Sequence, residues 1–125
     1  MLNREKDNLP LDLSYLREMS GDSAEFMIEM IDMFKQQTPI YIADLKAAIA
    51  DQDWARVSSC AHKIKPTFSY IGREDAKNHM QLIETAAKEA TNTEQIPGKF
   101  EEIEEFIESL YKQLDQAKSS LQERL

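Results

Sequence analysis

The sequence has 125 residues, 42% of them hydrophobic, with one cysteine, two histidines and a formal net charge of −8. This is enough for the core of one domain, and a lone cysteine excludes a disulfide framework or a cysteine-based zinc site. The acidic charge makes nucleic acid and anionic membranes poor partners, and no apolar run approaches the roughly 20 residues of a membrane span. The N-terminus has no signal-peptide-like apolar segment, so we expect a cytoplasmic protein.

Glycine and proline are scarce, at three and four residues in the whole chain. All-β folds need many turns, so this scarcity favours a helical chain. We expect residues 1–10 to form an N-terminal tail and residues 11–125 to form one domain. Within that domain the first element is a short helix over about residues 11–19, which Ser20 and Gly21 end.

The second predicted helix runs from about residue 22 to residue 51. Asp22, followed by Glu25 three residues later, is a candidate capping box at its start. Pro39 lies inside this helix and removes one backbone donor, which predicts a kink or a break there. Its apolar stripe is predicted at helical spacing: Phe26, Met30, Met33 or Phe34, Ile40, Leu45 and Ile49.

Three further helices follow, and the first of them has the most regular pattern. Asp53 is its candidate N-cap, and Gly72 is the glycine that ends it. Its apolar residues recur at gaps of three and four: Trp54, Val57, Ala61, Ile64, Phe68 and Ile71. The other two helices carry apolar positions from residue 76 to 90 and from residue 100 to 121, with a linker over residues 92–98.

Four long amphipathic helices joined by short loops predict an all-α fold, an antiparallel four-helix bundle with the short N-terminal helix as a lid. A coiled-coil oligomer built on the last helix is the alternative. We disfavour it because the other three helices also carry wide apolar stripes that need partners. We expect a monomer.

The segment over residues 61–72 is the most informative for function, because it carries His62 and Lys65. At 100° per residue, His62 lies about 120° from the centre of the apolar stripe, on the outward face. The neutral imidazole is a good nucleophile that can hold a phosphoryl group, and a lysine at i+3 can offset part of the phosphoryl charge. Small or compact residues nearby would leave room for a second protein: Ser58, Ser59, Pro66 and Ser69.

This segment resembles the signature of histidine-containing phosphotransfer (HPt) domains at four positions: His62, Ile64, Lys65 and Gly72. The likeness extends over most of the chain, from about residue 11 to residue 121. One departure is Pro66, which stands where the family usually places glycine or another small residue. The resemblance implies a phosphorelay intermediate that accepts a phosphoryl group from an aspartate of one receiver domain and passes it to another.

The resemblance also implies roles for individual residues. His62 would be the phosphoacceptor and Lys65 would stabilise the phosphoryl group. Glu84, 22 residues after the histidine, would hold the other ring nitrogen, and Gln81 is a less favourable substitute for it. The expected docking face for receiver domains comprises Ser58, Ser59, Pro66, Ser69 and Gly72.

The implied partners are response-regulator receiver domains and a hybrid sensor histidine kinase. Mg²⁺ is expected on the receiver domain, and no cofactor or metal on this chain, whose sequence has no nucleotide-binding loop. We therefore expect a phosphocarrier rather than an enzyme. Because the sequence starts with Met1, we also expect an independent protein rather than a part of a hybrid kinase.

Two alternatives from other classes stay open. One is a non-phosphorylated helical adaptor that binds a receiver or a kinase through the same face, and the other is an oligomerising helical scaffold. His79, which lacks a cation at i+3, is expected to be a surface residue outside the chemistry. Cys60 lies about 200° round the helix from His62, so a thiolate–imidazole pair is excluded and we expect it at the edge of the core.

Overall fold

The computed structural model describes residues 2–125, and within that range it contains helices and no strand. Three short helices are η1 (Arg4–Asn8), α1 (Ser14–Ser20) and η2 (Thr93–Gln95). Four long helices are α2 (Ala24–Ala50), α3 (Trp54–Tyr70), α4 (Glu74–Glu89) and α5 (Ile96–Gln122). The predicted all-α fold is therefore confirmed.

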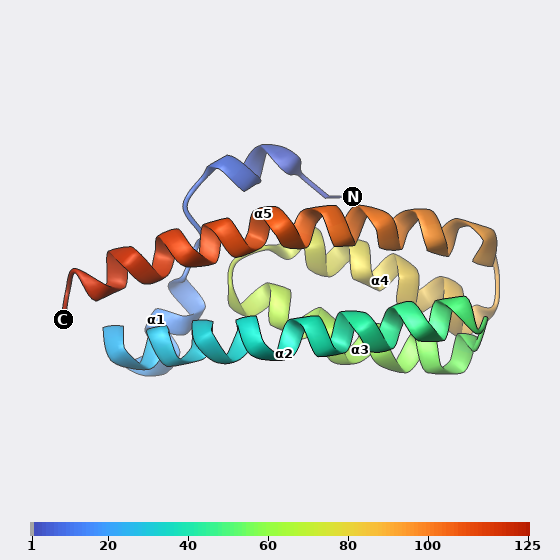
Figure 1. The fold of residues 1–125 in the computed structure, drawn as a ribbon, viewed down its shortest axis with the longest axis horizontal. Coiled ribbons are helices and arrows are strands. Elements are labelled where there is room, and N and C mark those ends of the chain that lie inside the picture. Colours follow the sequence, from blue (N-terminus) through green and yellow to red (C-terminus); the bar gives the residue numbers. More distant parts are fainter. Residues whose placement is uncertain (1) are drawn as a thin grey trace.

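The four long helices form a bundle in which successive helices run in opposite directions (Figure 1). α2 contacts α3 and α5, and α4 contacts the same two helices. α2 and α5 are the longest, and they extend beyond the α3–α4 hairpin at the end of the bundle where α1 packs on α2 (Figure 1). The short helix α1 therefore closes that end, as the sequence predicted for a lid.

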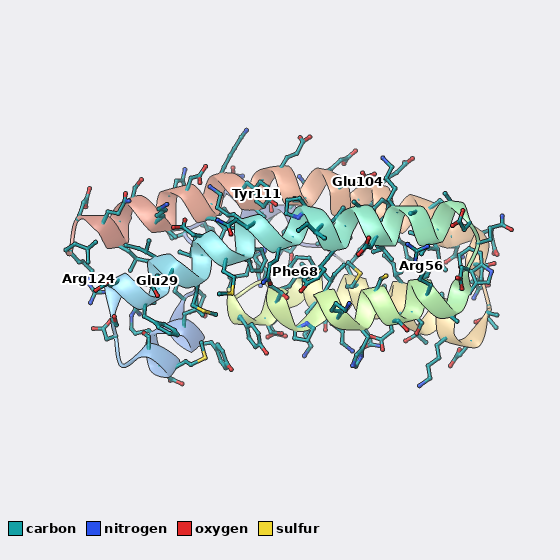
Figure 2. The ribbon with its side chains drawn as sticks, turned by 60° about the horizontal axis from the view of Figure 1, so that its bottom comes forward. Glu29, Arg56, Phe68, Glu104, Tyr111 and Arg124 are labelled. Carbon is teal, nitrogen blue, oxygen red and sulfur yellow. The ribbon has the colours of Figure 1, made fainter. Side chains whose placement is uncertain are left out.

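The core is a continuous set of apolar side chains from all four long helices and α1. Phe68 of α3 and Phe106 of α5 lie at its centre in an edge-to-face arrangement, with ring centroids 5.6 Å apart. Figure 2 shows Phe68 among the helices, whereas Arg56 and Glu104 point outward. A buried aromatic pair from opposite corners of the bundle fixes how far apart α3 and α5 lie.

The start of α2 differs by one residue from the prediction. Its N-cap is Ser23, whose hydroxyl accepts a hydrogen bond from the backbone N–H of Phe26 at 3.2 Å. Asp22 instead has a left-handed backbone with φ of 62°, and its carboxylate pairs with Arg17 and Arg124. The capping box proposed for Asp22 and Glu25 is therefore wrong.

Pro39 does not break α2, which is one helix from residue 24 to residue 50. The proline leaves the carbonyl of Lys35 without its usual amide donor, and the hydroxyl of Tyr111 on α5 donates to that carbonyl at 3.4 Å. The apolar stripe of α2 is also shifted from the prediction. Its buried residues include Met27, Ile31, Phe34 and Leu45, whereas Phe26, Met33 and Ile40 are exposed.

The N-terminal residues, which the sequence suggested as a tail, form the helix η1 and lie across α5 (Figure 1). Arg73, only 2% exposed, holds this segment: its Nη1 donates to Asp7 at 2.9 Å and its Nη2 donates to the carbonyl of Asn3 at 3.2 Å. Gln113 of α5 donates to the carbonyls of Lys6 and Leu9, at 2.7 Å each. We call this set of contacts the N-terminal clasp.

Each nitrogen of the Arg73 guanidinium in the clasp donates a hydrogen bond. Arg73 also donates to both carboxylate oxygens of Asp75 and to Oε1 of Gln113, and its guanidinium lies 4.6 Å from the centre of the Phe106 ring. Gly72, directly before it, has φ of 79°, and an added Cβ would lie 2.3 Å from the carbonyl oxygen of Asp12. The turn between α3 and α4 is therefore built against the N-terminal segment.

Candidate functional site

The site helix α3 begins and packs as its sequence predicts. The carboxylate of Asp53 caps it by accepting from the N–H of Arg56 at 3.3 Å. The predicted stripe is buried at Val57, Ala61, Ile64, Phe68 and Ile71, with Trp54 half-buried. Because this stripe faces the core, the opposite face of α3 is turned to solvent, and the side chain of His62 on it is 72% exposed.

Glu84 of α4 reaches across to the ring of His62, as the sequence led us to expect. Its Oε2 lies 3.3 Å from Nδ1 of the imidazole. An ionised carboxylate only accepts hydrogen bonds, so this contact places a ring proton on Nδ1. In the neutral ring the other nitrogen, Nε2, then carries the lone pair and faces away from Glu84, available to an incoming electrophile.

Lys65 lies close to His62 but points toward α4 rather than standing free beside the ring. Its Nζ is 2.9 Å from Oε1 of Glu84 and donates to Oε1 of Gln81 at 2.6 Å. Its side chain is 16% exposed and that of Glu84 13% exposed, so the ion pair is largely shielded from water. The carboxylate of Glu84 thus bridges the imidazole and the ammonium.

The charge state of Glu84 follows from these contacts. Burial raises the pKa of Glu84, but the hydrogen bond and the positive charge of Lys65, followed by those of His62, lower it by more. The pKa of Glu84 therefore lies below its ordinary value. At neutral pH the group is a carboxylate that accepts from the ring.

The residues predicted to form a docking face lie along α3 on either side of His62. Ser59 is exposed, and Ser58, Pro66 and Ser69 are half-buried. α3 continues through Pro66 to residue 70 without a break. The hydroxyl oxygen of Ser69 is buried and has no hydrogen-bond partner within the described part of the chain.

Gly72 was also predicted to belong to the docking face. The structure places it at the end of α3, beside the carbonyl of Asp12, with a left-handed backbone. A side chain at this position would meet the backbone of the N-terminal segment. Packing alone therefore accounts for glycine here.

Sequence reasoning missed an apolar patch beside the predicted face. It consists of Tyr15 of α1, Met33 of α2 and Tyr70 of α3, which are 47%, 49% and 38% exposed. The rings of Tyr15 and Tyr70 stack with centroids 4.9 Å apart. Next to them is a hollow of about 130 Å³, lined mainly by Leu16, Met30, Met33, Phe34, Thr67 and Tyr70.

The signal for this apolar patch was present in the sequence but ambiguous. Met33 and Phe34 are adjacent, and only one of them can face the core of a helix. The structure buries Phe34 at 7% exposure and leaves Met33 outside. Tyr70 lies eight residues after His62 on the same helix, roughly 12 Å along its axis.

The local charge also sets α3 apart from the rest of an acidic protein. This helix contains Arg56, Lys63 and Lys65 and no acidic residue. Lys63 lies over the ring of Tyr41 on α2, with Nζ 5.6 Å from its centre. The helix is therefore basic in a chain whose formal net charge is −8, with Arg56 paired to Asp51 and Lys65 paired to Glu84.

His79 was predicted to lie at the surface, and this is wrong. Its side chain is 2% exposed, and Nε2 donates to the carbonyl oxygen of Lys99 at 2.9 Å. The spacing explains the error, because His79 falls between Ala76 and Ile83 on the buried stripe of α4. It has no access to a partner, so His62 is the histidine that a second protein can reach.

Cys60 lies at the edge of the core, as predicted, and is half-buried. Burial raises the pKa of the Cys60 thiol, and the charge of Asp44 adds to this.

In the described part of the chain, histidine, cysteine and carboxylate side chains form no group of three or more suited to a metal ion. Among residues 2–125, no helix combines the length and apolar character needed to cross a membrane.

Comparison with known proteins gives two matches and one negative result. A search among curated proteins finds no match. Among solved structures, the chain is similar to the HPT domain of the Hpt sensor hybrid histidine kinase from Shewanella, with 22% sequence identity, a TM-score of 0.60 and 92% of each chain covered. The likeness to that crystal structure supports the bundle fold. The family model described as "Hpt domain" matches residues 29–120, well over half of the sequence, and the chain therefore belongs to the Hpt domain family.

Proposed function

We propose that this chain, as a member of a family that carries phosphoryl groups in phosphorelays, accepts a phosphoryl group on Nε2 of His62 from the aspartyl phosphate of one receiver domain and passes it to the aspartate of another. The observation that carries the proposal is the arrangement of the ring: 72% exposed, with Nδ1 held by Glu84 and Nε2 open to a partner.

The chemistry follows from that arrangement. The lone pair of Nε2 attacks phosphorus in line with the aspartyl oxygen, the P–N bond forms, and the P–O bond to the aspartate breaks to leave a carboxylate. The ring keeps its proton on Nδ1 and becomes cationic. The carboxylate of Glu84 stabilises that cation, and the reverse sequence returns the phosphoryl group to the next receiver.

The remaining requirements fall to the partner. The chain would act as a phosphocarrier and not as a catalyst of its own, with Mg²⁺ supplied on the receiver domain. The exposed Lys63 of α3 complements a partner whose reacting group is acidic, and the apolar patch of Tyr15, Met33 and Tyr70 offers further contact area. The cytoplasmic location and the monomeric state stay predictions from the sequence.

A non-phosphorylated adaptor that uses the same face remains the competing function. An adaptor has no use for a carboxylate that holds one ring nitrogen of an exposed histidine. The contact between Glu84 and His62 therefore favours the carrier.

Phosphotransfer from a purified receiver tests the proposal. A receiver domain charged with labelled acetyl phosphate is mixed with the wild-type chain and with His62→Gln. We expect the wild type to acquire an acid-labile, base-stable phosphate and the variant to acquire none. Helix content by circular dichroism should be unchanged, because the side chain of His62 is 72% exposed. Labelling of His62→Gln at the wild-type rate would overturn the assignment.

A further inference from the structure

The contacts around His62 continue one step beyond Glu84. Lys65 donates to Oε1 of Gln81 at 2.6 Å, and Nε2 of Gln81 donates to the hydroxyl of Thr85 at 3.0 Å. Gln81, Glu84 and Thr85 lie within two turns of α4, at the i, i+3 and i+4 positions that share a face. A continuous series of side-chain contacts thus connects the imidazole of His62 to Thr85 at the surface of α4.

The ammonium of Lys65, which can only donate, decides which end of the Gln81 amide faces it. The amide has an oxygen that accepts and an NH₂ group that donates, and the two are similar in size. A donor facing the ammonium would repel it. The amide oxygen therefore faces Lys65, and the NH₂ group donates to the Thr85 hydroxyl, which anchors the far side of the Gln81 side chain.

Lys65 in turn orients Glu84. Its ammonium has two defined partners, Gln81 Oε1 and Glu84 Oε1, and the two contacts hold Nζ at the α4 side of the ring. Held there, it engages one oxygen of Glu84 and leaves the other, Oε2, for Nδ1 of His62. Without Gln81 the flexible lysine stem has one anchor in place of two.

We propose that Gln81 and Thr85 are positioning residues for phosphotransfer, which hold Lys65 on Glu84 and thereby keep the ring proton of His62 on Nδ1. This inference rests on the proposed function for its effect on transfer. Its structural part concerns the unphosphorylated protein alone. Neither residue touches the reacting atoms.

Three variants test the two contacts separately. Gln81→Met removes the acceptor for Lys65 at similar side-chain length, and Thr85→Val removes the hydroxyl at similar shape. Thr85→Ser keeps the hydroxyl and serves as the conservative variant. Thr85 is exposed, so neither of its substitutions disturbs the core.

The first measurement is the tautomer of the His62 ring, read from its ¹⁵N shifts in the unphosphorylated protein at a pH where the ring is neutral. We expect the Nδ1–H form to dominate in the wild type and in Thr85→Ser. We expect the Nε2–H form to gain population in Gln81→Met and, to a smaller extent, in Thr85→Val. An unchanged tautomer ratio in Gln81→Met would overturn the positioning role.

The second measurement is the rate of phosphoryl transfer from a charged receiver. We expect a fall of roughly three- to tenfold in Gln81→Met and about twofold in Thr85→Val, since a hydrogen bond to a charged group is lost or misdirected. Thr85→Ser should restore the wild-type rate. A changed tautomer in a protein that accepts no phosphate at all would contradict the proposed function and leave the positioning role standing, so the two failures are distinguishable.

Discussion

Oε2 of Glu84 lies 3.3 Å from Nδ1 of His62, a contact between two helices that joins residues 22 positions apart in the chain. This contact fixes the orientation of the exposed His62 ring. In the neutral ring the proton lies on the nitrogen that faces Glu84, and the lone pair is on the nitrogen that faces away from it. Because Glu84 is also paired with Lys65, the carboxylate stays ionised while it does this.

Lys65→Met is expected to slow phosphoryl transfer by roughly tenfold, because the carboxylate of Glu84 loses the cation that orients it. The pKa of Glu84 should rise in this variant, since burial then acts without the ammonium that outweighs it. Transfer kinetics and the ¹³C shift of the Glu84 carboxyl measure the two effects. Lys63→Met is the matched control, because Lys63 is exposed and contacts Tyr41 instead. Equal slowing by both variants would point to a general loss of positive charge.

Met33→Ser is expected to weaken binding of a receiver domain roughly three- to tenfold, because the apolar patch loses contact area that the complex would bury. Leu82→Ser is the matched control: Leu82 is 46% exposed and Met33 49%, but Leu82 lies on α4 outside the patch. Isothermal titration of each variant with the same receiver gives the comparison. If both substitutions weaken binding alike, the patch has no special part in docking.

Gly72→Ala is expected to lower the free energy of unfolding by about 1–3 kcal/mol, because φ is 79° and the added Cβ meets the carbonyl of Asp12. Gly98→Ala has open space at the same point and lies in α5, so it should be neutral or stabilise by up to about 1 kcal/mol. Urea unfolding of both variants checks this. A transfer defect in Gly72→Ala without loss of stability would restore the predicted docking role.

Asp75 is expected to make the fold sensitive to acid. Burial raises the pKa of Asp75, but hydrogen bonds from Arg73 and from the backbone of Asn3 lower it by more. The pKa of Asp75 therefore lies below its ordinary value. A carboxyl group with a lowered native pKa contributes stability above its unfolded pKa of about 3.9, and this is lost as the pH falls through the native pKa. Between pH 5 and 2 the wild type should therefore lose stability more steeply than Asp75→Asn. Parallel slopes in the two proteins would contradict the role of this carboxylate.

The fold could be predicted from periodicity because the apolar residues of α3 recur at gaps of three and four on one face, and those of α4 and α5 do so with local departures such as His79. The buried set of α3 matches its predicted stripe, and the exposed position of His62 follows from the same wheel. The buried face of α2 was harder to predict, because runs such as Met33-Phe34 and Ile40-Tyr41-Ile42 allow several apolar faces. Only the neighbouring helices decide which of these faces is buried.

The parts that sequence reasoning missed depend on contacts between distant residues. A helical wheel shows that Lys65 is near His62, but it does not show that Gln81 and Glu84 on another helix engage the ammonium. The same holds for Arg73, whose partners lie 66 residues away at Asp7 and 40 residues away at Gln113. A single buried arginine in a polar loop has no periodic signature.

The N-terminal clasp links the first residues of the chain mechanically to the turn that follows the site helix. Tension on the N-terminus would pass through Asn3 and Asp7 to Arg73, which is 11 residues beyond His62. The region matched by the family model begins at residue 29. The N-terminal residues of the clasp lie outside that region and bind to the bundle within it. Removing the residues before position 29 would expose the guanidinium of Arg73 and the carboxylate of Asp75, which are now buried. If such a shortened protein failed to fold, that failure would say nothing about phosphotransfer.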